Sequence, residues 1–225
     1  MLSKIKAAIF DLDGTLIDSM GVWERVDRSF LARHGFAEDE NYIRALKDVN
    51  YRQAAEFTIS YLGLDMTMEE LFREWNEMAA WEYGHAIDLK PGAGDMLRFC
   101  KDAGLPIVLA TVSTQVLTKA VLERHGLYDL FTGFTDAAMA DIGKGAPDIY
   151  LQAASIAGVR PEECIVFEDI LKGIRSANAA GCVTCAFEDA SQASDKADLV
   201  KEADYYITSW QEGIQLLQRL EGEKA

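Results

Sequence analysis

The sequence predicts an α/β protein, with a parallel sheet of alternating strands and helices into which an all-helical segment is inserted. Three observations lead to this prediction. An apolar run from Ile5 to Phe10, interrupted only by Lys6, indicates a buried strand near the start of the chain. No convincing strand follows between residues 18 and 87, where only helical patterns occur. Beyond residue 91, strand and helix patterns alternate, which is typical of βαβ units.

The expected elements follow the chain in a simple order. Strands are expected at residues 6–11, 105–111, 130–134, 164–167, 182–187 and 205–208. Helices are expected at residues 24–34, 53–62, 68–83, 95–103, 115–125, 147–157 and 172–180. The domains that follow are a core of residues 1–17 and 88–225 and an inserted helical domain of residues 18–87.

Composition limits the classes of partner. The 225 residues carry a net charge of −15, and 49% of them are hydrophobic, as in a globular protein. An acidic surface repels phosphate backbones and anionic lipids, so neither nucleic acid nor a membrane is an expected partner. Four sparse cysteines, with no signal-peptide pattern, lead us to expect the reducing cytoplasm. We expect a monomer or a weak dimer.

Two acids stand where the first strand ends. Asp11 and Asp13 are separated by one residue, and in an extended segment residues i and i+2 point to the same side. In open α/β sheets, ligands bind beyond the carboxyl ends of the strands. Two carboxylates in one pocket repel each other, and a bound metal cation relieves that repulsion. The alternative is an ordinary strand-to-turn junction, for which Asp is also suited.

Two later stretches bring anion-binding groups to helix starts. Thr111, Val112 and Ser113 end a strand and open a helix, where hydroxyl and backbone N–H groups suit a phosphate. The alternative for this stretch is a simple helix cap. Lys144 lies between two glycines just before a helix that begins near Pro147. A lysine held in this way suits an anion, although a lone lysine is more often solvated.

A second pair of acids repeats the arrangement of the first. Glu168 and Asp169 follow an apolar strand pattern, and the alternative for them is a cap on the next helix. Two such acid pairs in one pocket would repel each other strongly without a divalent cation. Because the set contains only oxygen ligands and no histidine, it favours Mg²⁺ over Zn²⁺.

These stretches, taken in order, are similar to a known set of motifs. Asp11-Leu-Asp13-Gly-Thr, Thr111, Lys144 and Glu168-Asp169 resemble the four motifs of the haloacid dehalogenase superfamily, and the helical insertion resembles its type 1 cap. The resemblance implies a Rossmann-like core. It implies that Asp11 is a nucleophile that forms an aspartyl-phosphate, and that Asp13 is a general acid and base. The Mg²⁺ ligands it implies are Asp11, Asp13 through its carbonyl, and Asp169, with Glu168 close by.

The same resemblance assigns the anion-binding groups. Thr111 and the backbone N–H of Val112, with Ser113 adjacent, would hold the phosphoryl oxygens. Lys144 would neutralise both the phosphate and the attacking carboxylate. The expected partner is therefore a small phosphorylated metabolite, such as a sugar phosphate or a nucleotide.

The acid at position 13 distinguishes reactions within the superfamily. Dehalogenases generally lack an acid there, so Asp13 favours phosphoryl transfer. Within the superfamily, the chain most resembles the β-phosphoglucomutase and small-phosphatase group. Trp23 stands where the mutases typically have a histidine, which favours a Mg²⁺-dependent phosphatase over a hexose phosphomutase. A non-catalytic ligand-binding protein on the same fold is a further alternative. Two other positions depart from the family pattern. Gly145 stands where the family usually has Pro, and Ile170 stands where Ser or Thr is common.

The insertion is expected to determine the substrate. Lys47, Tyr51 and Arg52 lie in a polar stretch between helical patterns, and we expect them to contact the substrate. The alternative is an ordinary connection between helices whose charges are solvated.

Overall fold

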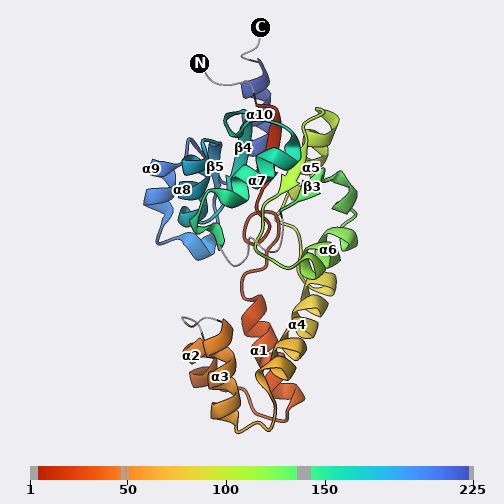
Figure 1. The fold of residues 1–225 in the computed structure, drawn as a ribbon, viewed down its shortest axis with the longest axis vertical. Helices are drawn as coiled ribbons and strands as arrows, with labels where there is room; N and C mark the ends of the chain where they lie inside the picture. Colours follow the sequence, from red (N-terminus) through yellow and green to blue (C-terminus); the bar gives the residue numbers. More distant parts are fainter. Residues whose placement is uncertain (1–4, 47–48, 50, 136–142, 223–225) are drawn as a thin grey trace. The chain divides into compact units, whose positions relative to one another are not determined.

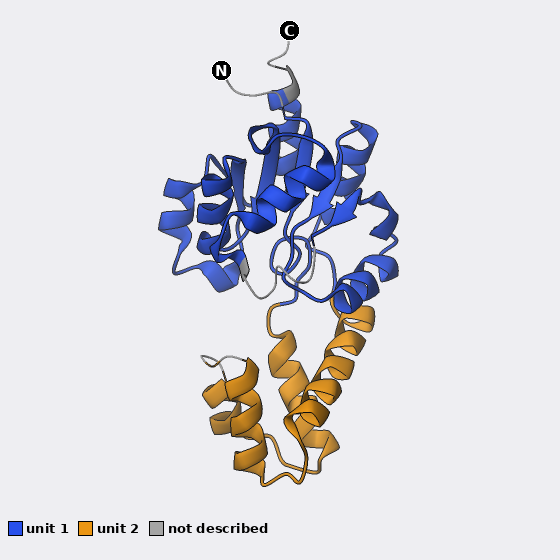
Figure 2. Cartoon of the chain, viewed as in Figure 1, with its two compact units in different colours: residues 1–19, 88–225 blue, residues 20–87 orange. Residues whose placement is uncertain are grey.

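The chain forms two compact units in a computed structural model that describes residues 5–46, 49, 51–135 and 143–222 (Figure 1). Unit 1 consists of residues 1–19 and 88–225, and unit 2 consists of residues 20–87, as Figure 2 shows in separate colours. Unit 1 is an α/β structure and the described part of unit 2 is entirely helical. The predicted fold class is therefore confirmed, whereas the role of unit 2 as a cap stays a prediction.

Unit 1 is built on a six-stranded parallel sheet in the order β3-β2-β1-β4-β5-β6. The strands are β1 (Ala7–Phe10), β2 (Ile107–Leu109), β3 (Gly133–Phe134), β4 (Cys164–Glu168), β5 (Val183–Phe187) and β6 (Tyr205–Ile207). The central strand β1 pairs through Phe10 with Leu109 on one side and with Phe167 on the other. This register brings the carboxyl ends of three strands to the same edge.

Helices cover both faces of this sheet. They are α5 (Ala93–Asp102), α6 (Gln115–Arg124), α7 (Asp148–Ala157), α8 (Leu171–Ala180), α9 (Lys196–Glu202) and α10 (Trp210–Gly222). On one face, Ile9 and Val166 pack in a buried cluster with Ile149 of α7. On the other, Phe10 and Phe167 contact Trp210 of α10, with ring centroids 5.7 and 5.4 Å away. Because the sheet is buried on both faces, the sequences of its central strands are continuous apolar runs.

The described residues of unit 2 form four helices, which are α1 (Val22–Arg33), α2 (Glu40–Leu46), α3 (Tyr51–Leu62) and α4 (Met68–His85). A capping box fixes the start of α4, because Thr67 and Glu70 accept each other's backbone N–H groups. Leu31, Tyr42 and Ile43 form a small buried cluster between α1 and α2. No strand occurs in the described part of this unit.

Several elements differ from the expectation. The strand expected at residues 130–134 is a 3₁₀ turn, Tyr128–Leu130, followed by the two-residue strand β3. Helices α2, α9 and α10 were absent from the prediction, although Trp210, Ile214 and Leu217 carry a helical period. All four cysteines are free and buried. None of the described helices has the length and apolar character needed to span a membrane.

Candidate active site

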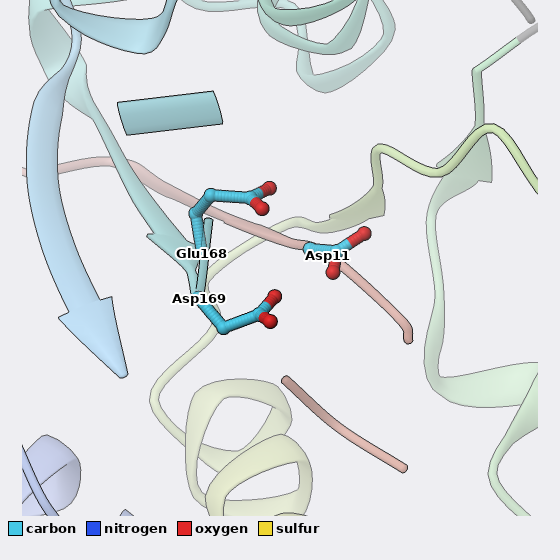
Figure 3. A group of neighbouring side chains, drawn as sticks. All are labelled: Asp11, Glu168 and Asp169. Atoms are coloured by element: carbon cyan, nitrogen blue, oxygen red, sulfur yellow. The ribbon is translucent and has the colours of Figure 1, made fainter. Parts of the chain in front are cut away.

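Two acid-bearing strand ends converge at the carboxyl edge of the sheet. Asp11 follows β1 directly, and Glu168 and Asp169 lie at the end of the neighbouring β4. One oxygen of each carboxylate lies within 4.8 Å of the others, and Figure 3 shows the three side chains extending from adjacent backbone segments. All three residues are at most 1% exposed. The structure thus gathers three buried carboxylates, which need compensating charge.

Lys144 supplies part of that charge. Its Nζ forms an ion pair with Asp11 Oδ1 and lies 3.0 and 2.9 Å from the two oxygens of Glu168. The Ser176 hydroxyl donates to the main-chain oxygen of Lys144 at 2.6 Å, which anchors the glycine-flanked turn. Lys144 is therefore a buried counter-charge rather than a solvated surface lysine.

Glu168 is held from several sides. Besides Lys144, it accepts hydrogen bonds from the Tyr150 hydroxyl, at 3.0 Å, and from the backbone N–H of Ile170, at 3.3 Å. The Cα of Gly173 faces its carboxylate so closely that an added Cβ would lie 2.5 Å from Cδ. Both oxygens of Glu168 already have donors, so its geometry is that of a partner that orients Lys144. A metal-ligand role for Glu168 stays a prediction.

Asp169 differs from Glu168 because only one of its two carboxylate oxygens accepts a hydrogen bond from a described residue. Thr15 Oγ1 donates to Asp169 Oδ1 at 2.9 Å and lies 3.2 Å from Asp11 Oδ2, so its single proton serves one of them at a time. Asp169 Oδ2 is buried and has no hydrogen-bond partner among the described residues. Gly14, with φ of 87°, packs against this oxygen, and a Cβ there would lie 2.5 Å from it.

Burial and crowding change the protonation equilibria of the cluster. Burial, followed by the charge of Glu168, raises the pKa of Asp11 well above its ordinary value, and the same causes raise the pKa of Asp169 to about 7. Burial opposes the charge on Lys144, but the carboxylates of Asp11 and Glu168 outweigh it and raise its pKa. Fully ionised, three carboxylates and one ammonium leave two negative charges uncompensated.

These residues fit a bound metal ion. The unpartnered oxygen of Asp169, the small Gly14 beside it and the excess negative charge all suit a cation. The donors are oxygen atoms only, and no histidine belongs to this group within the described chain. The set is therefore a candidate metal centre formed by Asp11 and Asp169.

The residues expected to bind phosphate lie beside this centre. Thr111 is buried at the end of β2, whereas Val112 is exposed. The backbone N–H of Ser113 donates to Thr111 Oγ1 at 3.1 Å, and the Ser113 hydroxyl donates to Asp13 Oδ2 at 2.6 Å. The carboxylate of Asp13 is thus directed to Ser113, while that of Asp11 joins the acidic cluster. The carbonyl of Asp13 as a metal ligand stays a prediction.

The structure adds residues that were not singled out from the sequence. Thr15, Tyr150 and Ser176 complete the hydrogen bonds of the cluster, and Gly14 and Gly173 leave room for its carboxylates. Thr15 and Gly14 belong to the first acidic motif, so their position beside Asp13 was a usable signal. Tyr150 and Ser176 lie at ordinary buried helix positions, which offer no such signal.

The expected specificity residues belong to unit 2. Lys47 lies outside the described residues, and Arg52 is exposed. Tyr51 lines a cavity of about 330 Å³ within this unit, together with Trp23 and Trp75. Its ring centroid lies 5.5 Å from that of Trp23 and 5.6 Å from that of Trp75. An aromatic wall of this kind suits the apolar face of a small molecule.

One acidic side chain in the lining of this cavity has no partner among the residues that the structure describes. Asp27 lines it, is 9% exposed and forms no hydrogen bond or ion pair with the described residues. Burial, with a smaller contribution from Glu24, raises the pKa of Asp27 to about 7. The indole N–H of Trp75 is buried and also lacks an acceptor among the described residues. The cavity of unit 2 thus offers one carboxyl group beside aromatic rings.

Curated proteins of similar sequence are phosphatases. Hexitol phosphatase A of Escherichia coli K12 is 33% identical over 185 residues, which cover 80% of this chain and 81% of that protein. Hexitol phosphatase B of the same strain is 30% identical over 191 residues, covering 79% and 81%. A probable pseudouridine-5'-phosphatase of Drosophila melanogaster is 29% identical over 203 residues, covering 87% of each chain.

A solved structure shows the same fold. A putative β-phosphoglucomutase from Thermotoga maritima superimposes with a TM-score of 0.84 at 24% identity, covering 96% of this chain and 99% of that one. The likeness extends to the helical insertion as well as the α/β unit. In addition, the family of haloacid dehalogenase-like hydrolases matches residues 5–181, which include both strand ends of the acidic cluster. The chain therefore belongs to the haloacid dehalogenase-like hydrolase family.

Proposed function

We propose that this protein is a metal-dependent phosphatase that hydrolyses a small organic phosphate monoester. The observation that carries the proposal is the buried group in which Lys144 pairs with the Asp11 carboxylate beside the unpartnered oxygen of Asp169. A nucleophile, a counter-charge and a metal ligand are the parts that attack on a phosphate dianion requires. The hexitol phosphatases that the chain resembles support the same reaction class.

In this proposal, Asp11 and Asp13 divide the chemistry between them. An oxygen of Asp11 attacks phosphorus while the bond to the leaving oxygen breaks, and Asp13 gives its proton to that oxygen. The aspartyl-phosphate so formed is then hydrolysed by water, whose proton returns to Asp13. The hydrogen bond from Ser113 to Asp13 Oδ2 fixes the direction of this carboxyl group.

The remaining residues of unit 1 balance charge. Lys144 offsets the charge of Asp11 and of the incoming phosphate. Thr111 and the backbone N–H of Val112, with Ser113 adjacent, receive the phosphoryl oxygens. We propose Mg²⁺ as the metal, since hard oxygen ligands favour it. Asp11, the carbonyl of Asp13 and Asp169 would hold the ion, which supplies a positive charge that stabilises the phosphoryl group in the transition state.

We further propose that unit 2 selects the substrate. Tyr51, Trp23 and Trp75 offer aromatic faces, while Asp27 accepts a hydrogen bond. A hydroxyl group can donate to Asp27, and the C–H face of a sugar or polyol packs on the aromatic rings. A phosphorylated sugar or polyol therefore fits these groups best. Lys47 and Arg52 remain proposed contacts for this ligand.

The free, buried cysteines fit a reducing compartment, and we propose the cytoplasm as the location.

Phosphate release tests the proposed function. Sorbitol 6-phosphate, mannitol 1-phosphate, fructose 1-phosphate, glucose 1-phosphate and pseudouridine 5'-phosphate are incubated with the protein, in Mg²⁺ or in a chelator. Turnover is expected in Mg²⁺ and is lost with the chelator. Asp11→Asn is expected to lose activity by several orders of magnitude, because a covalent nucleophile is removed.

The matched control is Asp102→Asn, which makes the same chemical change at an exposed position on α5. It is expected to keep full activity. A folded protein that releases no phosphate from any ester would refute the phosphatase, and binding without turnover would support the non-catalytic alternative. Conversion of glucose 1-phosphate to the 6-phosphate, instead of free glucose, would support the phosphomutase.

A further inference from the structure

The loop after β2 carries two hydroxyl side chains that are used in different ways. Thr111 is buried, and Ser113, two residues further on, is half-buried. The backbone N–H of Ser113 donates to Thr111 Oγ1 at 3.1 Å, and the Ser113 hydroxyl donates to Asp13 Oδ2 at 2.6 Å. Both hydrogen-bond donors of Ser113 are thus directed at groups of the protein itself.

Thr111 can serve a phosphate without giving up this arrangement. A hydroxyl oxygen that accepts one hydrogen bond still has its own proton to donate. Thr111 Oγ1 can therefore accept the N–H of Ser113 and donate to a phosphoryl oxygen at the same time. The Ser113 hydroxyl would have to leave Asp13 to do the same. The loop thus divides into a phosphate-binding part, which ends at Val112, and a part that serves Asp13.

The carboxyl group of Asp13 lies apart from the acids of the candidate metal centre. Figure 3 shows the three described acids that could hold a metal ion, and Asp13 is not one of them. Asp13 is also half-buried, whereas those acids are at most 1% exposed, so a leaving group can reach it. Because Asp11 and Asp13 follow the same strand end, an unrestrained carboxylate at Asp13 would be attracted to the same cation. The hydrogen bond from Ser113, 100 positions away in the chain, holds it apart.

We propose that Ser113 is the positioning residue of the general acid, so that its hydroxyl orients the carboxyl group of Asp13 toward the leaving oxygen and does not bind the phosphoryl group. This role rests on the proposed function. In the step concerned, a bond forms between an Asp11 oxygen and phosphorus, and the bond from phosphorus to the ester oxygen breaks. The proton of the Asp13 carboxyl group passes to that ester oxygen. Ser113 acts on this proton transfer alone.

Two esters with different leaving groups test this role. 4-Nitrophenyl phosphate releases a phenolate that is stable without a proton, whereas sorbitol 6-phosphate releases an alkoxide that must be protonated. We expect Ser113→Ala to lower kcat by about 10–100-fold for sorbitol 6-phosphate and by less than about threefold for 4-nitrophenyl phosphate. Ser113→Thr keeps the hydroxyl and should restore kcat. If another ester of the phosphate-release panel is the better substrate, it takes the place of sorbitol 6-phosphate.

Inhibition by inorganic phosphate separates this role from phosphate binding. In Ser113→Ala, KM and the Ki of inorganic phosphate should stay as in the unchanged protein. Thr111→Val, in contrast, should raise both, because it removes a proposed phosphate ligand. Thr114→Ala is the matched control in the same loop. The hydroxyl of Thr114 accepts the Leu117 N–H at the start of α6, so its loss should lower stability and leave kcat unchanged.

A double-mutant cycle shows whether Ser113 acts through Asp13. Asp13→Asn removes the acid, so Ser113→Ala should lower kcat no further in that background, because the group that it orients no longer transfers a proton. A hydroxyl that binds phosphate directly would keep its effect there. Thermal unfolding of each variant shows that it is folded.

Three results would overturn the role of Ser113. They are an equal loss of kcat with both esters, a raised Ki of inorganic phosphate in Ser113→Ala, and a full further loss when this change is added to Asp13→Asn. Each is obtained with a protein that is active when unchanged, so the proposed phosphatase survives them. An unchanged protein that hydrolyses no ester refutes the phosphatase itself, and the role of Ser113 falls with it.

Discussion

The candidate site of unit 1 and the cavity of unit 2 bury acidic side chains in opposite ways. In unit 1, Asp11 and Glu168 share the ammonium group of Lys144, and hydroxyl groups donate to the carboxylates around it. In unit 2, Asp27 is buried beside aromatic rings and has no hydrogen bond or ion pair with the described residues. Burial raises the pKa of Asp11 and of Asp27 alike. The difference between the two places lies in the partners that surround these acids.

That difference explains what each unit can do. Carboxylates with a counter-charge and space for a metal ion can act in their charged form, as phosphoryl transfer requires. A single buried acid whose pKa is about 7 is largely neutral below that pH and exchanges hydrogen bonds with uncharged groups. Charge chemistry is thus concentrated in unit 1, and the recognition of hydroxyl groups fits unit 2.

Removal of the counter-charge in unit 1 should have the largest effect. We expect Lys144→Met to lower kcat by about 10²–10³-fold, because the attack of one anion on another loses its neutralising group. The variant also leaves buried carboxylates unpaired, so a lower unfolding temperature is expected. Phosphate release at saturating Mg²⁺ measures the first effect, and thermal unfolding measures the second.

Lys172→Met is the matched control for this change. Lys172 lies at the start of α8, close to the same glycine-flanked turn, but its side chain is exposed. We expect kcat to stay near that of the unchanged protein. Equal losses in the two variants would show that general charge near the turn matters, and not the buried pairing of Lys144.

The space beside Asp169 should have the next largest effect. In Gly14→Ala, the added Cβ would lie 2.5 Å from Asp169 Oδ2, so the carboxylate must move away from the candidate metal position. We expect a loss of Mg²⁺ affinity of about 10–100-fold, measured by calorimetric titration.

Gly181→Ala separates this effect from backbone strain. Gly181 has φ of 86°, close to the 87° of Gly14, yet no atom lies within 4 Å of the position that an added Cβ would take. The two alanine variants should therefore lose similar stability, whereas Mg²⁺ affinity should fall only in Gly14→Ala. Unchanged Mg²⁺ affinity in Gly14→Ala would exclude Asp169 Oδ2 as a ligand atom.

The sequence predicted the ends of strands better than the contacts across them. Asp11 and Asp169 were found because each follows an apolar run, and Lys144 because two glycines flank it. These signals are local, so a single stretch of chain carries them. Tyr150 and Ser176 reach the cluster from α7 and α8 only after the sheet has formed. Ordinary helical residues of this kind become site residues through packing, which no local pattern encodes.

The missed elements have similar causes. Helix α10 has an apolar period, but its role is visible only where Trp210 packs against Phe10 and Phe187. Strand β3 is an edge strand of two residues, too short for periodicity to define, and the apolar residues before it form a 3₁₀ turn. The unpartnered state of Asp27 is likewise a property of its surroundings in unit 2 rather than of its neighbours in the chain.

The unpaired acid of unit 2 should show the smallest effect, with a characteristic dependence on pH. The pKa of Asp27 is about 7 in the folded protein, above the ordinary 3.8 expected when the chain is unfolded. Between these values the folded state binds a proton that the unfolded state has lost, so the contribution of Asp27 to stability falls as pH rises through about 7. Asp27→Asn lacks this titration. Relative to the unchanged protein, the variant should gain about 1.4 kcal/mol between about pH 6 and about pH 8, a tenfold change in the unfolding equilibrium.

Tryptophan fluorescence can follow this unfolding locally, because Trp23 and Trp75 line the same cavity as Asp27. Asp65→Asn, at an exposed position of the same unit, is the control, and its difference from the unchanged protein should be the same at both pH values. A pH-independent difference for Asp27→Asn would mean that Asp27 is ionised throughout this range in the folded protein. It would then need a counter-charge, and the contrast between a charged site in unit 1 and a neutral one in unit 2 would fail.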